Sequence, residues 1–173
     1  MEAPDIQGTE ERASLRRSHF LTPTPARDWN RIIGWTCLAV GVGTGLILGL
    51  WSFDGPVTVP SWIGEYGDTS RRLVRLGHIA FIGLGILNIL LGRELPRLAL
   101  TAGGRRVASL AMNFGNIFLP LTLFAAGAHH PLKLLMAAPA LAVFLALVLA
   151  AYGTRRAPAP SFEVDEPGSS NTS

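Results

Sequence analysis

The chain has 173 residues, of which 49% belong to the hydrophobic set and 16% are charged, and its mean hydropathy is +0.34. Because an ordinary soluble domain carries about 25% charged residues, this composition excludes a disordered protein and argues against a water-soluble globule. The formal charge of +3 does not indicate a nucleic-acid partner, since the basic residues lie at the ends of apolar runs rather than in one patch. We therefore expect a lipid bilayer as the partner and no nucleic acid.

Polar segments flank the apolar part of the sequence on both sides. Residues 1–31 contain many charged side chains and two closely spaced prolines, Pro23 and Pro25, which disfavour a regular helix. Residues 155–173 are rich in proline, serine and glycine and lack the apolar content that would offset chain entropy. We predict that both segments are disordered tails on the cytoplasmic side of a membrane.

Four apolar runs lie between the tails, at about 32–53, 73–92, 107–128 and 134–154. Roughly twenty apolar residues in a helix cross a hydrocarbon core of about 30 Å, so each run is long enough to span a bilayer. The first, third and fourth runs carry no charge, and the second contains only Arg75, which can extend toward the headgroups. The sequence therefore predicts an all-α integral membrane protein whose domain covers residues 32–154.

The connections predict an antiparallel bundle of four transmembrane helices. Residues 129–131 leave room only for a hairpin between the third and fourth helices, and Pro131 suits the first turn of the fourth. We expect Pro120 to kink the third helix and Pro139 to do the same to the fourth. In the connection 93–106, three leucines should dip into the interface: Leu95, Leu98 and Leu100. The longer loop 54–70 is expected to lie on the membrane surface.

The distribution of basic residues predicts which side each end faces. If the N-terminus is inside, eleven arginines lie in cytoplasmic segments and four basic residues lie outside, namely Arg71, Arg72, Arg75 and Lys133. Cytoplasmic segments carry the excess of Lys and Arg, so we predict that both termini are cytoplasmic. Fourteen of the 15 basic residues are arginine, as in GC-rich genomes, and this favours the inner membrane of a bacterium as the location.

Two sets of residues are candidates for helix contacts. Gly41, Gly45 and Gly49 are spaced four apart on the first helix, and such a ridge lets a neighbouring backbone approach closely, within the bundle or in a homo-oligomer. The second set lies on one face of the third helix: Ser109, Asn113, Asn116 and Pro120. Asn88 on the second helix should lie at a similar depth and pair with Asn113. These amides either form interhelical hydrogen bonds or line a polar pocket for a small ligand.

Histidines supply a third set of candidates. His78 lies within the second apolar run, and His129 and His130 lie at the outer end of the third, so the three share one side of the bundle. Imidazole is the commonest metal ligand, and His78 with His129 or His130 could hold a haem iron or another metal. Against this, we expect His78 to lie deeper than the other two, and the sequence has no CxxCH motif.

These patterns favour a small multi-pass membrane protein that acts as a non-enzymatic subunit or accessory factor of a membrane complex. The sequence contains neither HExxH nor GxSxG, so the common membrane-bound hydrolases have no support. One alternative is a haem- or metal-binding electron carrier that uses His78. Another is a small transporter or channel whose path is lined by Asn88, Asn113 and Asn116.

Overall fold

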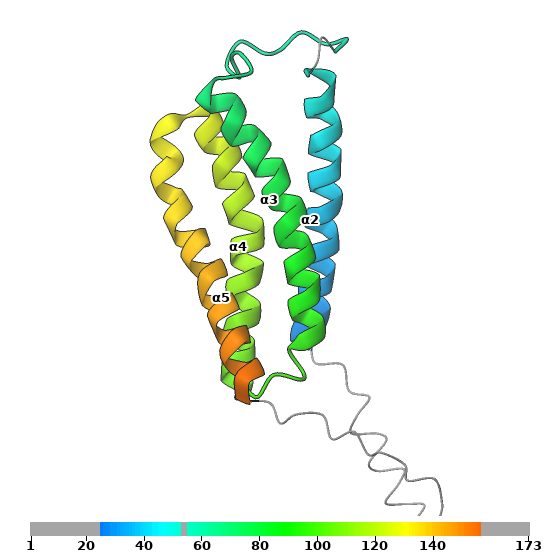
Figure 1. Cartoon of the computed structure of the whole chain (residues 1–173), viewed down its shortest axis with the longest axis vertical. Coiled ribbons are helices and arrows are strands. Elements are labelled where there is room, and N and C mark those ends of the chain that lie inside the picture. Colours follow the sequence, from blue (N-terminus) through cyan, green and yellow to red (C-terminus); the bar gives the residue numbers. More distant parts are fainter. Residues whose placement is uncertain (1–24, 53–54, 157–173) are drawn as a thin grey trace, which may run out of the picture.

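The structure, a computed structural model, describes residues 25–52 and 55–156, so most of both predicted tails lies outside it. The described residues form helices and loops, with no strand among them (Figure 1). In chain order the elements are α2 (Pro25–Leu50), α3 (Thr69–Glu94), α4 (Ala102–Ala128), the 3-10 helix η1 (His130–Met136) and α5 (Ala137–Arg156). Four helices, with η1 and α5 counted as one, are long and apolar enough to cross a membrane.

Each helix begins or ends with a polar turn beyond its apolar run. The helix α2 starts at Pro25, where a proline lacks only an N–H that the first turn would leave unbonded anyway. The helix α4 starts at Ala102, and the Thr101 hydroxyl caps it by accepting the Gly104 N–H at 3.1 Å. The predicted runs are therefore the apolar centres of longer helices.

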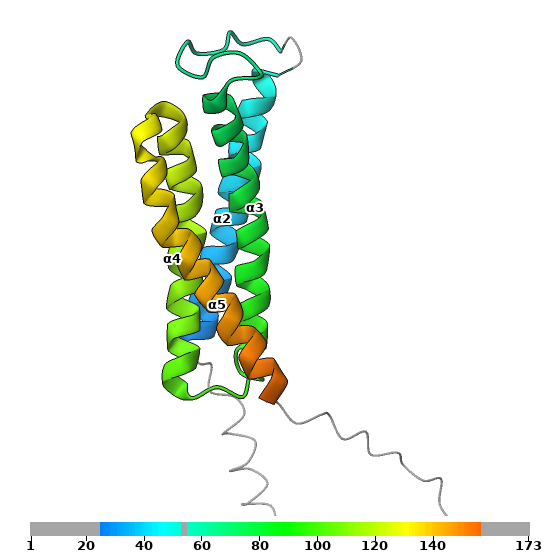
Figure 2. The same cartoon turned by 60° about the vertical axis from the view of Figure 1, so that its left-hand side comes forward.

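The helices α2, α3 and α4 pack against one another, and α5 lies on the far side of α4 (Figures 1 and 2). Consecutive helices are antiparallel, as the short connections predict. The principal contact of α5 is with α4, so α5 lies at the side of the group formed by α2, α3 and α4 and the bundle is not symmetric. Much of the α5 surface is consequently left on the outside of the molecule.

Glycines lie where the helix axes come closest together. A Cβ atom added at Gly85 of α3 would be 2.8 Å from the Gly34 carbonyl oxygen and 3.1 Å from the Leu38 nitrogen, both in α2. On α4, a Cβ at Gly115 would collide with Val143 of α5 and lie 3.0 Å from the Pro139 carbonyl oxygen. Small residues thus allow direct backbone contact between helices, as is usual in membrane proteins.

The apolar core lies at the end of the bundle where α3 connects to α4. Its buried members come from three helices and the connecting loop: Leu91, Leu95, Leu98, Ala108, Met112 and Ala146. The loop is held against the end of α5 by the Ala99 N–H, which donates to the Gly153 carbonyl oxygen at 3.1 Å. Leu95 and Leu98 of this loop are buried within the protein, and Leu100 packs against the same core.

Two prolines behave differently from each other. Pro120 lies inside α4, which continues through it to Ala128. Pro139, expected within the fourth helix, instead lies in the first turn of α5, because residues 130–136 form a 3-10 helix and the α-helix begins only at Ala137. A proline in this first turn costs no α-helical hydrogen bond, and the change from 3-10 to α-helical geometry falls three residues before it. The expected kink at Pro139 stays a prediction. Pro131 lies in the first turn of η1, as predicted.

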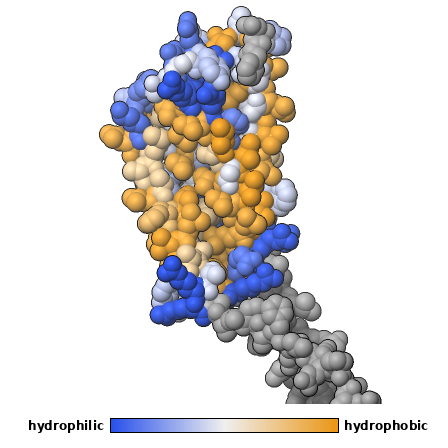
Figure 3. Space-filling model, viewed as in Figure 1, coloured by the Kyte–Doolittle hydropathy of each residue, from blue (hydrophilic) through white to orange (hydrophobic). Residues whose placement is uncertain are grey.

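On the face shown in Figure 3, an apolar belt covers the middle of the molecule, and polar residues gather at its two ends. The belt contains large side chains that are more than half exposed, such as Leu46 on α2, Ile79 on α3 and Phe144 on α5. A soluble protein rarely exposes so much contiguous apolar surface, whereas lipid tails cover it without cost. The four long apolar helices and this exposed apolar surface together suggest a small multi-pass membrane protein.

Because α2 and α3 approach closely, adding one methyl group to a glycine of α3 should change stability at some positions and not at others. Gly85→Ala should lower the free energy of unfolding by about 1–3 kcal/mol, because its Cβ meets backbone that cannot move aside cheaply. Gly83→Ala, two residues away and facing open space, should be neutral or slightly stabilising. SDS titration of the purified protein in mild micelles measures both, and equal effects would contradict the packing described.

Candidate functional site

A cluster of buried polar side chains joins α2, α3 and α4 close to the apolar core. It comprises one asparagine from each helix and a serine: Asn30, Asn88, Asn113 and Ser109. Asn30 and Asn88 are completely buried, and Ser109 and Asn113 are less than a tenth exposed. We call these four residues the amide network.

Hydrogen bonds run through the amide network in one direction. The Ser109 hydroxyl donates to Asn30 Oδ1. Asn30 Nδ2 then donates to Asn88 Oδ1 at 2.6 Å, and Asn88 Nδ2 donates to Asn113 Oδ1 at 2.8 Å. Each bond joins two different helices, so the network ties all three together. Such interhelical bonds are worth on the order of 1 kcal/mol each in a membrane protein.

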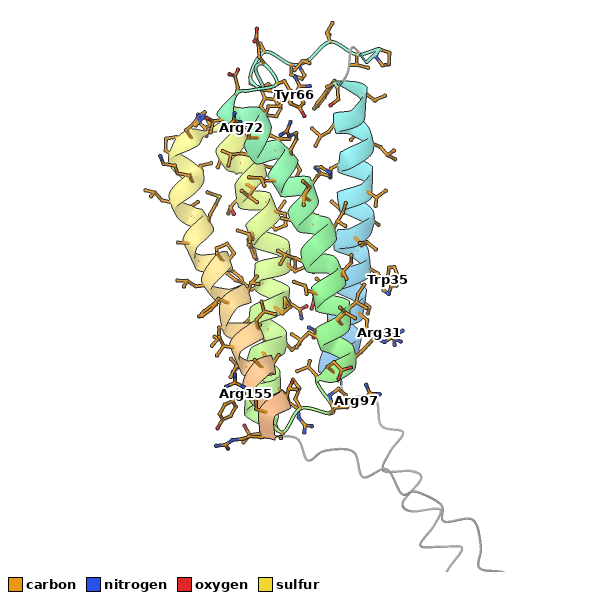
Figure 4. All side chains as sticks on the ribbon, viewed as in Figure 1. Arg31, Trp35, Tyr66, Arg72, Arg97 and Arg155 are labelled. Atoms are coloured by element: carbon orange, nitrogen blue, oxygen red, sulfur yellow. The ribbon has the colours of Figure 1, made fainter. Side chains whose placement is uncertain are left out.

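The sequence predicts the contact between Asn88 and Asn113 and the inward face of α4, and both are present. It does not predict Asn30, which was assigned to the polar tail because the apolar run starts at Ile32. The missed signal is helical spacing. Asn30 precedes Gly34 and Gly41 by four and eleven residues, which places it on the glycine face of α2. Arg31 and Trp35 point outward from the same part of the helix (Figure 4).

Asn116 lies one turn beyond Asn113 but outside the network. Its side chain is completely buried, and neither Nδ2 nor Oδ1 has a hydrogen-bond partner among the described residues. Its backbone carbonyl also lacks the usual helical donor, because Pro120, four residues later, has no N–H. The Cys37 thiol of α2 replaces this donor weakly, with an S···O distance of 3.9 Å.

The chemistry of the amide network is that of a structural contact. Amides and hydroxyls do not change charge in the physiological pH range, and the lone pairs and N–H groups used in the three bonds are no longer available to a ligand. The network therefore stabilises and orients the helices. Its members provide no general acid, base or nucleophile in the form in which they are held.

The candidate metal ligands are not gathered into one cluster. His78 lies against α2, where a Cβ added at Gly45 would be 3.2 Å from His78 Cδ2. His129 and His130 are exposed at the junction of α4 and η1. Phe124 packs on Gly77, so His78 lies at the level of Phe124, more than one turn below His129. No group of three or more His, Cys, Asp or Glu that could hold a metal ion occurs within residues 25–52 and 55–156.

Part of the predicted glycine ridge lies against α3. A Cβ at Gly41 would meet Ile82 of α3 at 2.7 Å, and Gly45 faces His78. Gly49 has no neighbour within 4 Å of an added Cβ. Gly41 and Gly45 thus serve packing inside the protein, and Gly34, which the spacing of four did not include, makes the closest contact.

No family model matches the sequence, and neither a curated protein nor a solved structure is significantly similar to it. The function must therefore be argued from the geometry of this chain.

Two buried asparagines provide a matched test of the amide network. Asn88→Ala should destabilise the protein by about 1–3 kcal/mol, because it leaves the Asn30 amide and Asn113 Oδ1 unpaired in a buried setting. Asn116→Ala removes an amide that has no partner and should be close to neutral or stabilising. Unfolding in mixed SDS micelles measures the difference, and a larger loss for Asn116→Ala would contradict this assignment.

Proposed function

We propose that this protein is a non-enzymatic subunit or accessory factor of a complex in the inner membrane of a bacterium. The observation that carries the proposal is the amide network, whose side chains bond to one another across three helices rather than facing a substrate. A transporter path lined by Asn88 and Asn113 has less support, because their amides already bond to each other.

The peripheral position of α5 also supports a role in assembly. Its buried residues are small or compact, namely Pro139, Val143, Ala146 and Gly153. Pro139 and Val143 lie against Gly115 of α4, and Gly153 lies against Leu98 and Leu100 of the loop before α4. Its remaining faces carry large exposed residues such as Leu141, Phe144 and Val148. A helix held on one narrow stripe leaves a wide apolar surface for lipid or for the helices of a partner.

The distribution of arginines supports an orientation with both ends in the cytoplasm. Arg31, Arg97 and Arg155 lie together at one end of the bundle, with Arg72 and Tyr66 at the other (Figure 4). At the Tyr66 end, the guanidinium groups of Arg71 and Arg75 form cation–π contacts with the Tyr66 ring. These two arginines therefore have a structural role in addition to any effect on membrane orientation. The end that holds Arg31 is thus the natural cytoplasmic end under the positive-inside rule.

Cysteine labelling tests this orientation. In a Cys37→Ala background, Ser61→Cys should react with a membrane-impermeant maleimide in intact spheroplasts, whereas Ala102→Cys should react only after permeabilisation. Both positions are exposed and lie at opposite ends of the bundle. Labelling of Ala102→Cys alone in intact spheroplasts would reverse the orientation, and labelling of both would contradict four spans.

Photo-crosslinking tests the proposed assembly. A photoreactive amino acid at Phe144 on α5 or at Leu46 on α2, both well exposed, should give a discrete heavier adduct in the native host. The same substitution at Met112, which is fully buried, is the internal control and should give none. If neither exposed face yields an adduct and the extracted protein runs as a monomer on a native gel, the proposal fails.

An absorption spectrum of the same preparation tests the alternative of an electron carrier. A haem Soret band lost in His78→Ala would favour that alternative over a purely structural role. The position of His78 against Gly45, away from the exposed His129 and His130, gives this alternative less support than the assembly proposal.

A further inference from the structure

A second group of polar side chains lies at the opposite end of the bundle, where α3 begins beneath the loop 55–68. Arg71, in the first turn of α3, is only 8% exposed and donates from Nη2 to the Trp51 carbonyl oxygen at 2.6 Å. Arg75 follows one turn later on the same face of the helix. Two guanidinium groups, one of them buried, therefore lie close together at this end of the protein.

Both arginines converge on one aromatic ring. The guanidinium carbon of Arg75 lies 4.5 Å from the centroid of Tyr66, and that of Arg71 lies 5.3 Å from it. Each contact is individually favourable, but two cations drawn to one ring also repel each other. An anion between or beside them would remove the repulsion.

Carboxylates of the described residues do not neutralise this pair. The ion pair that the structure shows within residues 25–52 and 55–156 joins Arg97 to Glu94, at the other end of α3. Asp68, which immediately precedes α3, instead accepts the Glu65 N–H on Oδ2 at 2.8 Å. Arg75 Nη1 is buried and has no hydrogen-bond partner among the described residues. One strong donor at this site is therefore left over.

A cavity of about 510 Å³ lies beside Arg71 and Tyr66, and it is lined by Trp51, Gly55, Val57, Thr58, Val59, Tyr66 and Arg71. Arg75, whose guanidinium carbon is 4.5 Å from the centroid of the Tyr66 ring, is not part of this lining. This volume is in the range that holds a small organic ligand and exceeds what a simple inorganic anion needs. Its lining combines a guanidinium and two aromatic rings with valine side chains. Such a site suits a molecule with an anionic head and an apolar or glycerol-like remainder.

We propose that Arg71, Arg75 and Tyr66 form a binding site for the phosphate of an anionic glycerophosphate headgroup. Guanidinium groups match phosphate oxygens in charge and geometry, and the unused Arg75 Nη1 supplies a donor. The site lies between the apolar belt and the loop that closes the end of the bundle, which is the depth of lipid headgroups (Figures 1 and 3). The phosphate comes from a membrane lipid or from a soluble glycerol phosphate.

Native mass spectrometry of the full-length protein in a nonionic detergent tests the site. The probes are phosphatidylglycerol, phosphatidylcholine with the same acyl chains, and sn-glycerol 3-phosphate. Wild-type protein should retain phosphatidylglycerol in preference to phosphatidylcholine, whose choline offsets the phosphate charge. Binding of glycerol 3-phosphate as tight as that of phosphatidylglycerol identifies a soluble ligand, and much weaker binding identifies a lipid.

Arginine variants separate a built site from general surface charge. Arg75→Gln should weaken phosphatidylglycerol binding about tenfold, the loss expected when one charged hydrogen bond is removed. Arg72→Gln, the matched control, removes the same charge from an exposed position between the two and should change binding less than about twofold. Tyr66→Leu should weaken binding without altering the net charge, since the ring positions both guanidinium groups.

Three results would overturn the proposal. The first is a wild-type protein that shows no preference for phosphatidylglycerol and does not bind glycerol 3-phosphate. The second is an equal loss of phosphatidylglycerol affinity in Arg72→Gln and Arg75→Gln. The third is unchanged phosphatidylglycerol affinity in Arg75→Gln. Arg71→Gln is not used in this test, because Arg71 also donates a hydrogen bond to the Trp51 carbonyl oxygen. The test therefore depends on the Arg75 and Tyr66 variants.

Discussion

The direct backbone contact between α2 and α3 at Gly34 and Gly85 is the constraint on which the rest of the bundle depends. Asparagine side chains are short, so amides on neighbouring helices meet only where the helix axes are close. Asn30 lies one turn from Gly34, and Asn88 lies one turn from Gly85. The two glycines therefore bring the amides within 2.6 Å of each other, and the apolar surroundings make their pairing obligatory.

The spans, their order and the inward face of α4 could be predicted because the hydrophobic pattern reports burial in lipid directly. The same pattern failed at its edges. Asn30 is polar yet lies inside the bundle, and a hydropathy boundary at Ile32 excludes it although the helix continues to Pro25. The 3-10 geometry of residues 130–136 was not predicted either, because composition does not distinguish a 3-10 helix from the first turns of an α-helix. Both omissions concern helix ends, where local geometry rather than apolar content decides.

Apart from the pairing of Asn88 with Asn113, the contacts between side chains of different segments were not predicted. The weak bond from Cys37 to the Asn116 carbonyl depends on Pro120, which removes the usual donor, and on the position of α2, which supplies another. Tyr66 meets Arg71 and Arg75 only because the loop 55–68 folds back over α3. Sequence spacing places residues on one helix face, but it does not indicate which loop covers that face.

The two ends of the bundle solve the problem of buried polar groups in opposite ways. At one end the amide network is neutral, and its three hydrogen bonds join its own members. At the other end Arg71 and Arg75 carry charge that a tyrosine ring and one carbonyl oxygen compensate only in part. Neutral hydrogen-bond donors and acceptors can satisfy one another, whereas two like charges repel each other. The first end therefore holds its polar groups through its own hydrogen bonds, whereas at the second end the proposed anion would compensate the remaining charge.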